Sequence, residues 1–537
     1  MQPRMDYDDA GWEKSDEICD TWVHRFFDTE ISRPIGHFIL RYHKPDEAVQ
    51  FEILEKGGYN ISLQMTYFSG TAAVIRFPMP GAVMFPEEKV RSEVAIMRYL
   101  YDQTSIPVPF VYHWGPKESC PLEVGPYIIM EYITHDSSMY KLLNFPGCPV
   151  SDRGRLDPDI DENTLEALYT EMANVLLQLS KPSFSRIGSL TQIDDFTWEV
   201  ENRPLSMGAN ELVRVGSLPQ SCLPKKAFDS TSSYFEALAD LHIAHLKHQR
   251  NDAIDSADDC RRKFTARRLF RKLARENKLT KRWAAFDKGP FKIWGDDFRP
   301  SNVLMNKMKI ASIVDFEFTY TAPIEFLYSP PWWLLIEKPE YWPDGLEDWT
   351  QIFSRRLPTF LKGMIKCEDA AIKKGRLTEN ERLSTPMQES WESGDFWTTY
   401  AARNSFAFDS IYWEKIDQRF FGPVESTSIE DAWKERLCLL SDEERDEMEQ
   451  LVSQKLQEME SRVLAWDPDE YTKSHIDIAK TYAAEQSGKE AKESKEGGEV
   501  DSLGSGTDGD VEIENIQGKL DDPDDQQISE MLAQLST

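Results

Sequence analysis

The sequence predicts an α+β fold in two parts, a small β-rich part followed by a large, mainly helical part. Between Phe51 and Pro78, apolar and polar residues alternate with a period of two, as at Ile61 and Leu63, and glycines interrupt the runs. This pattern is typical of three antiparallel strands. Residues 87–101 change to helical spacing, and from about residue 163 apolar residues recur at spacings of three and four, which predicts amphipathic helices.

The later elements follow from the same two patterns. Strand-like segments follow residue 109, and the last of them is the apolar run 127–133, at which the β-rich part ends. Helical spacing then predicts helices in four regions of the second part: residues 165–179, 233–246, 391–421 and 442–464.

The composition is that of a globular protein with an excess of acid. The chain has 537 residues, with 93 Asp and Glu against 62 Lys and Arg, a net charge of −31 and 40% hydrophobic residues. The length suggests about two to four structural units. Because a phosphate backbone is bound mainly through Lys and Arg, a charge of this sign argues against a nucleic-acid partner.

No segment predicts a membrane partner. The longest apolar runs, such as residues 330–336, fall far short of the ~20 residues that span a bilayer. The acidic first nine residues lack the apolar core of a signal peptide, so we expect the protein in the cytoplasm. The seven cysteines are scattered without a Cys-x-x-Cys pair, so neither disulfide frameworks nor zinc fingers are expected.

One pattern of acidic residues indicates which reaction the protein could catalyse. Asp297 precedes Asn302 by five residues, and Asp315 follows Asn302 by thirteen, with two apolar runs and a turn at residues 306–309 between them. Phosphoryl transfer needs a carboxylate that takes or orients a hydroxyl proton. It also needs an amide oxygen and a second carboxylate that hold Mg²⁺ against a triphosphate. The alternative is an ordinary hairpin with acidic ends, because Asp and Asn are common turn residues.

At these residues the sequence resembles the aminoglycoside phosphotransferase and choline kinase branch of the protein-kinase-like fold. Four later stretches resemble the fungal-type members of this family: residues 319–326, 329–335, 389–397 and 408–413. The resemblance implies a bilobal fold with a small β-rich N-lobe and a large, mainly helical C-lobe. It also implies ATP and Mg²⁺ as cofactors and a small-molecule hydroxyl as the phosphoryl acceptor. Asp297 then corresponds to the catalytic base, Asn302 to a metal ligand and Asp315 to the metal-bridging carboxylate. Glu317 matches the second acid of the family and joins the expected metal ligands.

The motif departs from the family pattern at two adjacent positions, and at the second of them Asp296 stands where the family has Gly. Gly295 stands where the family usually has His, a residue that mainly packs there. We prefer Asp297 to Asp296 as the base, because only Asp297 has the five-residue spacing to Asn302. Arg299 lies where protein kinases carry a Lys near the transferred phosphate, and its guanidinium is expected to stabilise developing charge there.

The resemblance extends to the nucleotide-binding residues of the first part. Gly57 and Gly58 stand where a loop would cover the phosphates with backbone N–H groups, although a plain hairpin turn uses the same residues. On the following strand, Val74 corresponds to the residue that meets adenine. Arg76 replaces the usual Lys that meets the α- and β-phosphates, and Arg can also bind phosphate with two donors.

Three further residues complete the expected nucleotide site. Glu93, on the predicted helix over residues 87–101, is expected to pair with Arg76, although a solvated helix Glu is the alternative. The run 127–133 resembles the linker between lobes, so that backbone groups at Glu131 and Ile133 would bond the adenine edge. A plain buried strand is the alternative for this run.

A basic cluster lies between residues 261 and 282, with Arg267 and Arg275 among its members. Such a cluster would either steer an anionic substrate or pair with nearby acids as a solvated helix face. We favour the solvated face.

These observations predict four segments and one activity. The segments are an N-terminal extension (1–50), a nucleotide-binding N-lobe (51–133), a helical C-lobe with the catalytic loop and acceptor region (134–485), and an acidic disordered tail (486–537). The tail has 14 acidic and 4 basic residues, and its residues 528–535 would form either a frayed helix or a docking helix for a protein partner. The expected activity is ATP- and Mg²⁺-dependent phosphoryl transfer to a small molecule. The alternative is a weak or inactive kinase-like scaffold that binds nucleotide.

Overall fold

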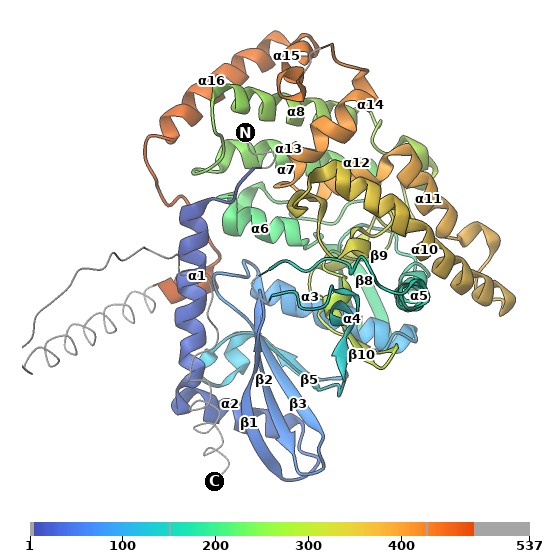
Figure 1. The fold of residues 1–537 in the computed structure, drawn as a ribbon. Coiled ribbons are helices and arrows are strands. Elements are labelled where there is room, and N and C mark those ends of the chain that lie inside the picture. The colour runs from blue at the N-terminus through green and yellow to red at the C-terminus, as the bar shows by residue number, and fades with distance from the viewer. Residues whose placement is uncertain (1–4, 150–151, 426–427, 477–537) are drawn as a thin grey trace, which may run out of the picture.

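The computed structural model describes residues 5–149, 152–425 and 428–476. The chain folds into a small lobe around one antiparallel sheet and a larger lobe made mainly of helices (Figure 1). This architecture confirms the predicted bilobal α+β fold. The predicted tail from residue 486, with its helix over residues 528–535, lies outside the described residues.

The small lobe contains the predicted strands and helix. Its sheet is antiparallel throughout, with strand order β1-β2-β3-β5-β4. Its elements are α1 (Asp9–His24), α2 (Thr29–Tyr42), β1 (Ala48–Lys56), β2 (Asn60–Tyr67), β3 (Ala72–Pro78), α3 (Pro86–Gln103), β4 (Val111–Gly115) and β5 (Tyr127–Glu131).

Helices cover both faces of this sheet. Trp22 of α1 and Ile35 of α2 share a buried cluster with Ile61 of β2, whereas Val94 of α3 packs in the same cluster as Val74 of β3. Successive side chains of a strand point to opposite faces of the sheet. The sheet therefore contributes side chains to a separate buried cluster on each of its faces. The two helices that precede residue 50 therefore form one side of the small lobe.

Helix α1 also joins the two lobes. Just before it, the Asp8 N–H donates to the Val215 carbonyl of the large lobe at 2.8 Å. Within α1, the Ser15 hydroxyl donates to the Gly81 carbonyl of the small lobe at 2.9 Å. In Figure 1 the helix runs from the large lobe down along the sheet.

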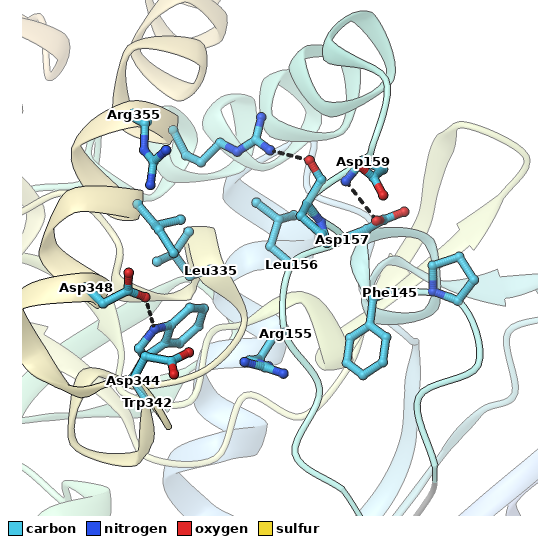
Figure 2. Close-up of a pocket in the computed structure, with 14 residues that line it drawn as sticks. Phe145, Arg155, Leu156, Asp157, Asp159, Leu335, Trp342, Asp344, Asp348 and Arg355 are labelled. Atoms are coloured by element: carbon cyan, nitrogen blue, oxygen red, sulfur yellow. Dashed lines mark hydrogen bonds between the residues drawn. The ribbon is translucent and has the colours of Figure 1, made fainter.

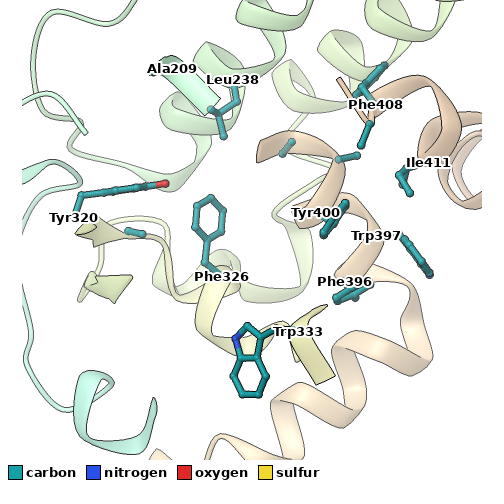
Figure 3. Packing of buried hydrophobic residues seen from close by; sticks show 14 of the residues in the cluster. Ala209, Leu238, Tyr320, Phe326, Trp333, Phe396, Trp397, Tyr400, Phe408 and Ile411 are labelled. Carbon is teal, nitrogen blue, oxygen red and sulfur yellow. The ribbon is translucent and has the colours of Figure 1, made fainter. Parts of the chain in front are cut away.

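The large lobe encloses an extensive apolar core. Phe326, Trp333, Phe396 and Phe408 are all at most 2% exposed and come from separate elements that converge on one interior (Figure 3). The elements of this lobe are β6 (Ser137–Ser138), α4 (Met139–Leu143), α5 (Glu162–Leu179), β7 (Ser189–Asp194), β8 (Thr197–Asn202), α6 (Met207–Val215), α7 (Thr231–His248), α8 (Ala257–Arg275), β9 (Lys292–Gly295), β10 (Val303–Asn306), β11 (Lys309–Ile313), β12 (Thr319–Ala322), α9 (Ile324–Tyr328), α10 (Gly345–Lys373), α11 (Ser384–Ser393), α12 (Asp395–Arg403), α13 (Phe408–Ile411), α14 (Asp417–Phe421), α15 (Ala432–Arg436) and α16 (Asp442–Glu458).

Two short strand pairs position the acidic motif. Strand β10 pairs with β11 to form the predicted hairpin, and β9 pairs with β12 so that Gly295 lies opposite Thr319. Asp297 comes two residues after Gly295, and Glu317 comes two residues before Thr319. The antiparallel pairing therefore brings these two acids to the same end of the strand pair.

Within the described parts of the chain, no helix is both long and apolar enough to cross a membrane.

Glu325 in α9 is a buried acid whose pKa makes stability depend on pH. Its side chain is 4% exposed, and neither carboxylate oxygen has a hydrogen-bond partner among the described residues. Burial, with Asp287 and Asp395 nearby, raises the pKa of Glu325 to about 8. Because the folded pKa exceeds the unfolded one, the stability linked to this group is full below the unfolded pKa and is lost as pH rises towards about 8.

We therefore expect the melting temperature of the wild type to fall between about pH 5 and about pH 8, partly through Glu325. The variant Glu325→Gln keeps the shape of the side chain but cannot ionise, so its melting temperature should fall less over the same range. Thermal unfolding of both proteins across this pH series measures the difference. Parallel curves for the two proteins would show that Glu325 does not carry the effect.

Candidate functional site

Three carboxylates converge where the two lobes meet. Asp297, Asp315 and Glu317 each offer one oxygen, and these oxygens lie within 4.8 Å of one another. Asp297 and Glu317 are 5% and 1% exposed, and Asp315 is partly exposed. The predicted spacing thus brings together the expected base and two of the expected metal ligands.

The chemistry of this cluster fits Mg²⁺, because hard divalent cations prefer carboxylate oxygens. Burial, together with repulsion from Asp315, raises the pKa of both Asp297 and Glu317, and a cation between the three groups would relieve that repulsion. One oxygen, Glu317 Oε1, is buried and has no hydrogen-bond partner within the described residues. Such an oxygen is available as a metal ligand.

Asn302 and Arg299 hold the Asp297 side chain. The Asn302 side-chain amide donates to the Asp297 carbonyl at 2.9 Å and to Asp297 Oδ2 at 3.2 Å. Arg299 Nε lies 3.0 Å from Asp297 Oδ1, and its side chain is 45% exposed. Asn302, expected as a metal ligand, thus orients the expected base in this structure, and its role as a ligand stays a prediction.

Arg76 joins the two lobes at the cluster. From β3 it forms an ion pair with Glu93 of α3, as expected, and its Nη1 also lies 2.9 Å from Asp315 Oδ1. Burial alone would raise the pKa of Glu93, but the positive charges of Arg76 and Lys89 outweigh burial and lower it. Glu93 is therefore a charged anchor for Arg76.

The sequence did not indicate Lys89, a second buried cation at the site. Its side chain is 1% exposed, and its Nζ pairs with Glu317 Oε2. The same Nζ donates to Asn60 Oδ1 at 2.8 Å and lies 3.6 Å from Glu93 Oε2. The sequence does contain one local indication of this cation: Lys89 and Glu93 are four residues apart, and such a pair shares one face of a helix.

The glycine turn lies between β1 and β2. The Gly57 N–H donates to the Asn60 carbonyl at 2.8 Å, which closes the hairpin. A Cβ added at Gly58 would meet no atom within 4 Å. Nothing in the described chain therefore requires glycine at Gly58, and the phosphate-binding role of both glycines stays a prediction.

The expected adenine-binding residues lie around the end of β5. Val74 is 4% exposed and pairs with Met130 across the sheet. The Glu131 N–H donates to the Phe110 carbonyl at 2.9 Å, whereas the Ile133 N–H has no backbone partner among the described residues. Of these two N–H groups, only that of Ile133 is therefore open to a ligand.

The structure explains the departure at Gly295. A Cβ there would lie 3.1 Å from Phe298 Cβ and 3.4 Å from Thr319 Oγ1, so a side chain as large as His would force its neighbours to shift. Asp296 accepts hydrogen bonds from the Trp294 indole at 2.7 Å and from the Met207 N–H at 3.2 Å. These separate partners support the choice of Asp297 over Asp296.

A cavity of about 760 Å³ lies in the large lobe between the segment before α5 and the start of α10. Arg155 projects between Trp342 and Phe145, with its guanidinium 5.6 and 5.9 Å from the two ring centres (Figure 2). The Leu156 N–H donates to the Leu335 carbonyl at 3.0 Å, which ties the wall of this cavity to the segment after Trp333. The rings of Trp333 and Phe298, the neighbour of Asp297, are 6.1 Å apart.

Comparison with known proteins finds no family model and no curated protein that matches the chain. Among solved structures, a thermostable mutant of aminoglycoside phosphotransferase APH(4)-Ia in complex with AMP-PNP and hygromycin B is 14% identical. It aligns over 70% of this chain and 97% of its own, with a TM-score of 0.35. ADP-bound aminoglycoside phosphotransferase APH(2'')-Ib is 13% identical over 71% and 99% of the two chains, with a TM-score of 0.34. An ethanolamine kinase from Plasmodium vivax is 13% identical over 76% and 88%, with a TM-score of 0.35.

Proposed function

We propose that this protein is an ATP- and Mg²⁺-dependent phosphotransferase that moves the γ-phosphoryl group of ATP to a hydroxyl of a small molecule. The convergence of Asp297, Asp315 and Glu317 within 4.8 Å carries the proposal. A base beside two metal-binding carboxylates is the arrangement that phosphoryl transfer needs.

Asp297 takes the proton of the acceptor hydroxyl. Asn302 and Arg299 fix its carboxylate through the contacts at 3.2 and 3.0 Å, and burial raises its pKa, which makes it a stronger base. Arg299 is half-exposed and carries a permanent charge, so it stabilises negative charge on the phosphoryl group as the bond to the leaving oxygen breaks.

Asp315 and Glu317 would hold Mg²⁺, with Asn302 as the further expected ligand. When bound, the ion neutralises charge on the β- and γ-phosphate oxygens. Arg76, anchored by Glu93, binds the α- and β-phosphates.

The remaining small-lobe residues hold the rest of the nucleotide. Gly57 and Gly58 cover its phosphates, while Val74 and the backbone of Glu131 and Ile133 hold its adenine ring.

The acceptor is a small molecule bound in the large lobe. The cavity beside Arg155 and Trp342 offers apolar and charged walls of the right scale for such a compound (Figure 2). As parts of the same proposal, the protein acts in the cytoplasm and its acidic tail recruits a protein partner.

The test is transfer of labelled phosphate. The purified protein is incubated with Mg²⁺, ATP labelled in the γ-phosphate, and separate hydroxyl compounds that include amino alcohols, sugars and aminoglycosides. Labelled phosphate should appear on at least one compound and depend on Mg²⁺. If ATP binds but label reaches none of them, the result favours the scaffold alternative.

The alternative is an inactive scaffold that binds nucleotide, and one observation favours it. Arg76 Nη1 lies 2.9 Å from Asp315 Oδ1, so a side-chain cation already neutralises a carboxylate that the metal needs. In an active enzyme Mg²⁺ must strengthen ATP binding despite this pair. In the scaffold, ATP affinity would be the same with and without Mg²⁺.

A further inference from the structure

We propose that Lys89 is a positioning residue of this site, which holds Glu317 in place for the metal and links it to the glycine turn. The inference rests on the proposed function, because it concerns the metal and nucleotide of the same site.

Lys89 connects three segments that are far apart in the sequence. It projects from α3, Asn60 begins β2, and Glu317 precedes β12. Its Nζ pairs with Glu317 Oε2, donates to Asn60 Oδ1 at 2.8 Å and approaches Glu93 Oε2 to 3.6 Å. An ammonium group donates up to three hydrogen bonds and accepts none, and two of its donors here go to Glu317 Oε2 and Asn60 Oδ1, while Glu93 is held only as an ion pair.

The contacts select one oxygen of Glu317. Oε2 pairs with Lys89 and accepts the Asn60 side-chain amide at 3.0 Å, whereas Oε1 has no partner among the described residues. Lys89 and Asn60 thereby fix the rotation of the carboxylate and leave Oε1 to take the ion. Groups that orient a metal ligand in this way typically change metal affinity by about 10–100-fold when removed.

The same network reaches the glycine turn. The Asn60 carbonyl accepts the Gly57 N–H at 2.8 Å, and the Asn60 side chain lies between Lys89 and Glu317. Gly57 of the turn is thus hydrogen-bonded to Asn60, which in turn contacts the expected metal ligand Glu317. The position of the turn over the phosphates and the position of Glu317 are therefore set together.

Positioning and simple electrostatics predict opposite effects of removing Lys89. The variant Lys89→Met removes a positive charge beside Glu317, which by Coulomb attraction alone would strengthen Mg²⁺ binding. If Lys89 positions Glu317, its loss weakens Mg²⁺ binding instead. The sign of the change separates the two roles.

The test measures ATP binding as a function of Mg²⁺ concentration in the full-length protein. Lys263→Met is a matched control, because Lys263 is 2% exposed and pairs with Asp259, four residues away on α8, at 2.7 Å. We expect Lys89→Met to raise the Mg²⁺ concentration for half-maximal ATP binding by about tenfold, and Lys263→Met to leave it unchanged.

An unchanged or lower Mg²⁺ midpoint in Lys89→Met overturns the inference. If Lys89→Met does not fold, Asn60→Ser breaks the same link, and an unchanged midpoint in that variant overturns the inference as well. Failure of the proposed function looks different, because the wild type itself would then show no Mg²⁺-dependent ATP binding.

Discussion

The variant Asp297→Asn is expected to abolish phosphoryl transfer and to leave ATP binding largely intact. The amide has nearly the same shape and volume as the carboxylate, so it still fits between Asn302 and Arg299, although it carries no negative charge. It cannot accept the proton of the acceptor hydroxyl, and removal of a general base costs about 10²–10⁴-fold in rate. The labelled-phosphate assay measures the loss, and a thermal shift with Mg²⁺ and ATP reports binding.

Asp296→Asn is the matched control for this experiment. Asp296 is the adjacent residue, its side chain is 8% exposed, and its hydrogen-bond partners are Trp294 and Met207. We expect this variant to keep transfer within about tenfold of the wild type, because its carboxylate is not the base. Transfer at the wild-type rate in Asp297→Asn would contradict the assigned base, and so would an equal loss in both variants.

The second large effect concerns stability. Arg267 of α8 is 1% exposed and forms two hydrogen bonds, at 2.6 and 2.9 Å, with Asp409 of α13, which is fully buried. The variant Arg267→Met leaves this carboxylate buried without its partner, and breaking such a pair typically costs about 3–5 kcal/mol. Urea unfolding should therefore give a free energy of unfolding lower by that amount.

Two further variants separate this explanation from general damage to α8. Arg275 lies on the same helix as Arg267, and Arg275→Met removes its exposed pair with Glu236 of α7 at 2.8 Å. This change should cost about 1 kcal/mol or less. The double variant Arg267→Met/Asp409→Leu removes both buried charges and should recover much of the lost stability. A loss of less than about 1 kcal/mol in Arg267→Met alone would contradict the assigned role of the pair.

Much of the fold and the acidic cluster follows from local sequence patterns. Alternation predicts β2 and β3 because side chains of a strand point alternately to its two faces, and helical spacing predicts α3. The acidic cluster also follows from spacing along the sequence. The β10–β11 hairpin lies between Asn302 and Asp315 and brings Asp315 back beside Asn302. A short antiparallel pair thus turns a distance along the sequence into proximity in space.

The partners of this cluster depend on contacts that no local pattern records. Asn60 and Glu317 are 257 residues apart, and Lys89 joins them only because α3 packs between the sheet and the large lobe. The basic cluster gives a second example. Arg275 is on the expected solvated face, but Arg267 is buried against α13, and the sequence of α8 alone does not identify the helix that covers it.

The most direct test is a calorimetric titration of ATP into the wild type and Asp315→Ala, each with and without Mg²⁺. Asp315 belongs to the acidic cluster and also pairs with Arg76. Its loss should therefore remove the effect of Mg²⁺ on the affinity for ATP. We predict that Mg²⁺ strengthens ATP binding to the wild type and not to Asp315→Ala. ATP binding to the wild type that is absent, or that is identical with and without Mg²⁺, would contradict the proposed phosphotransferase.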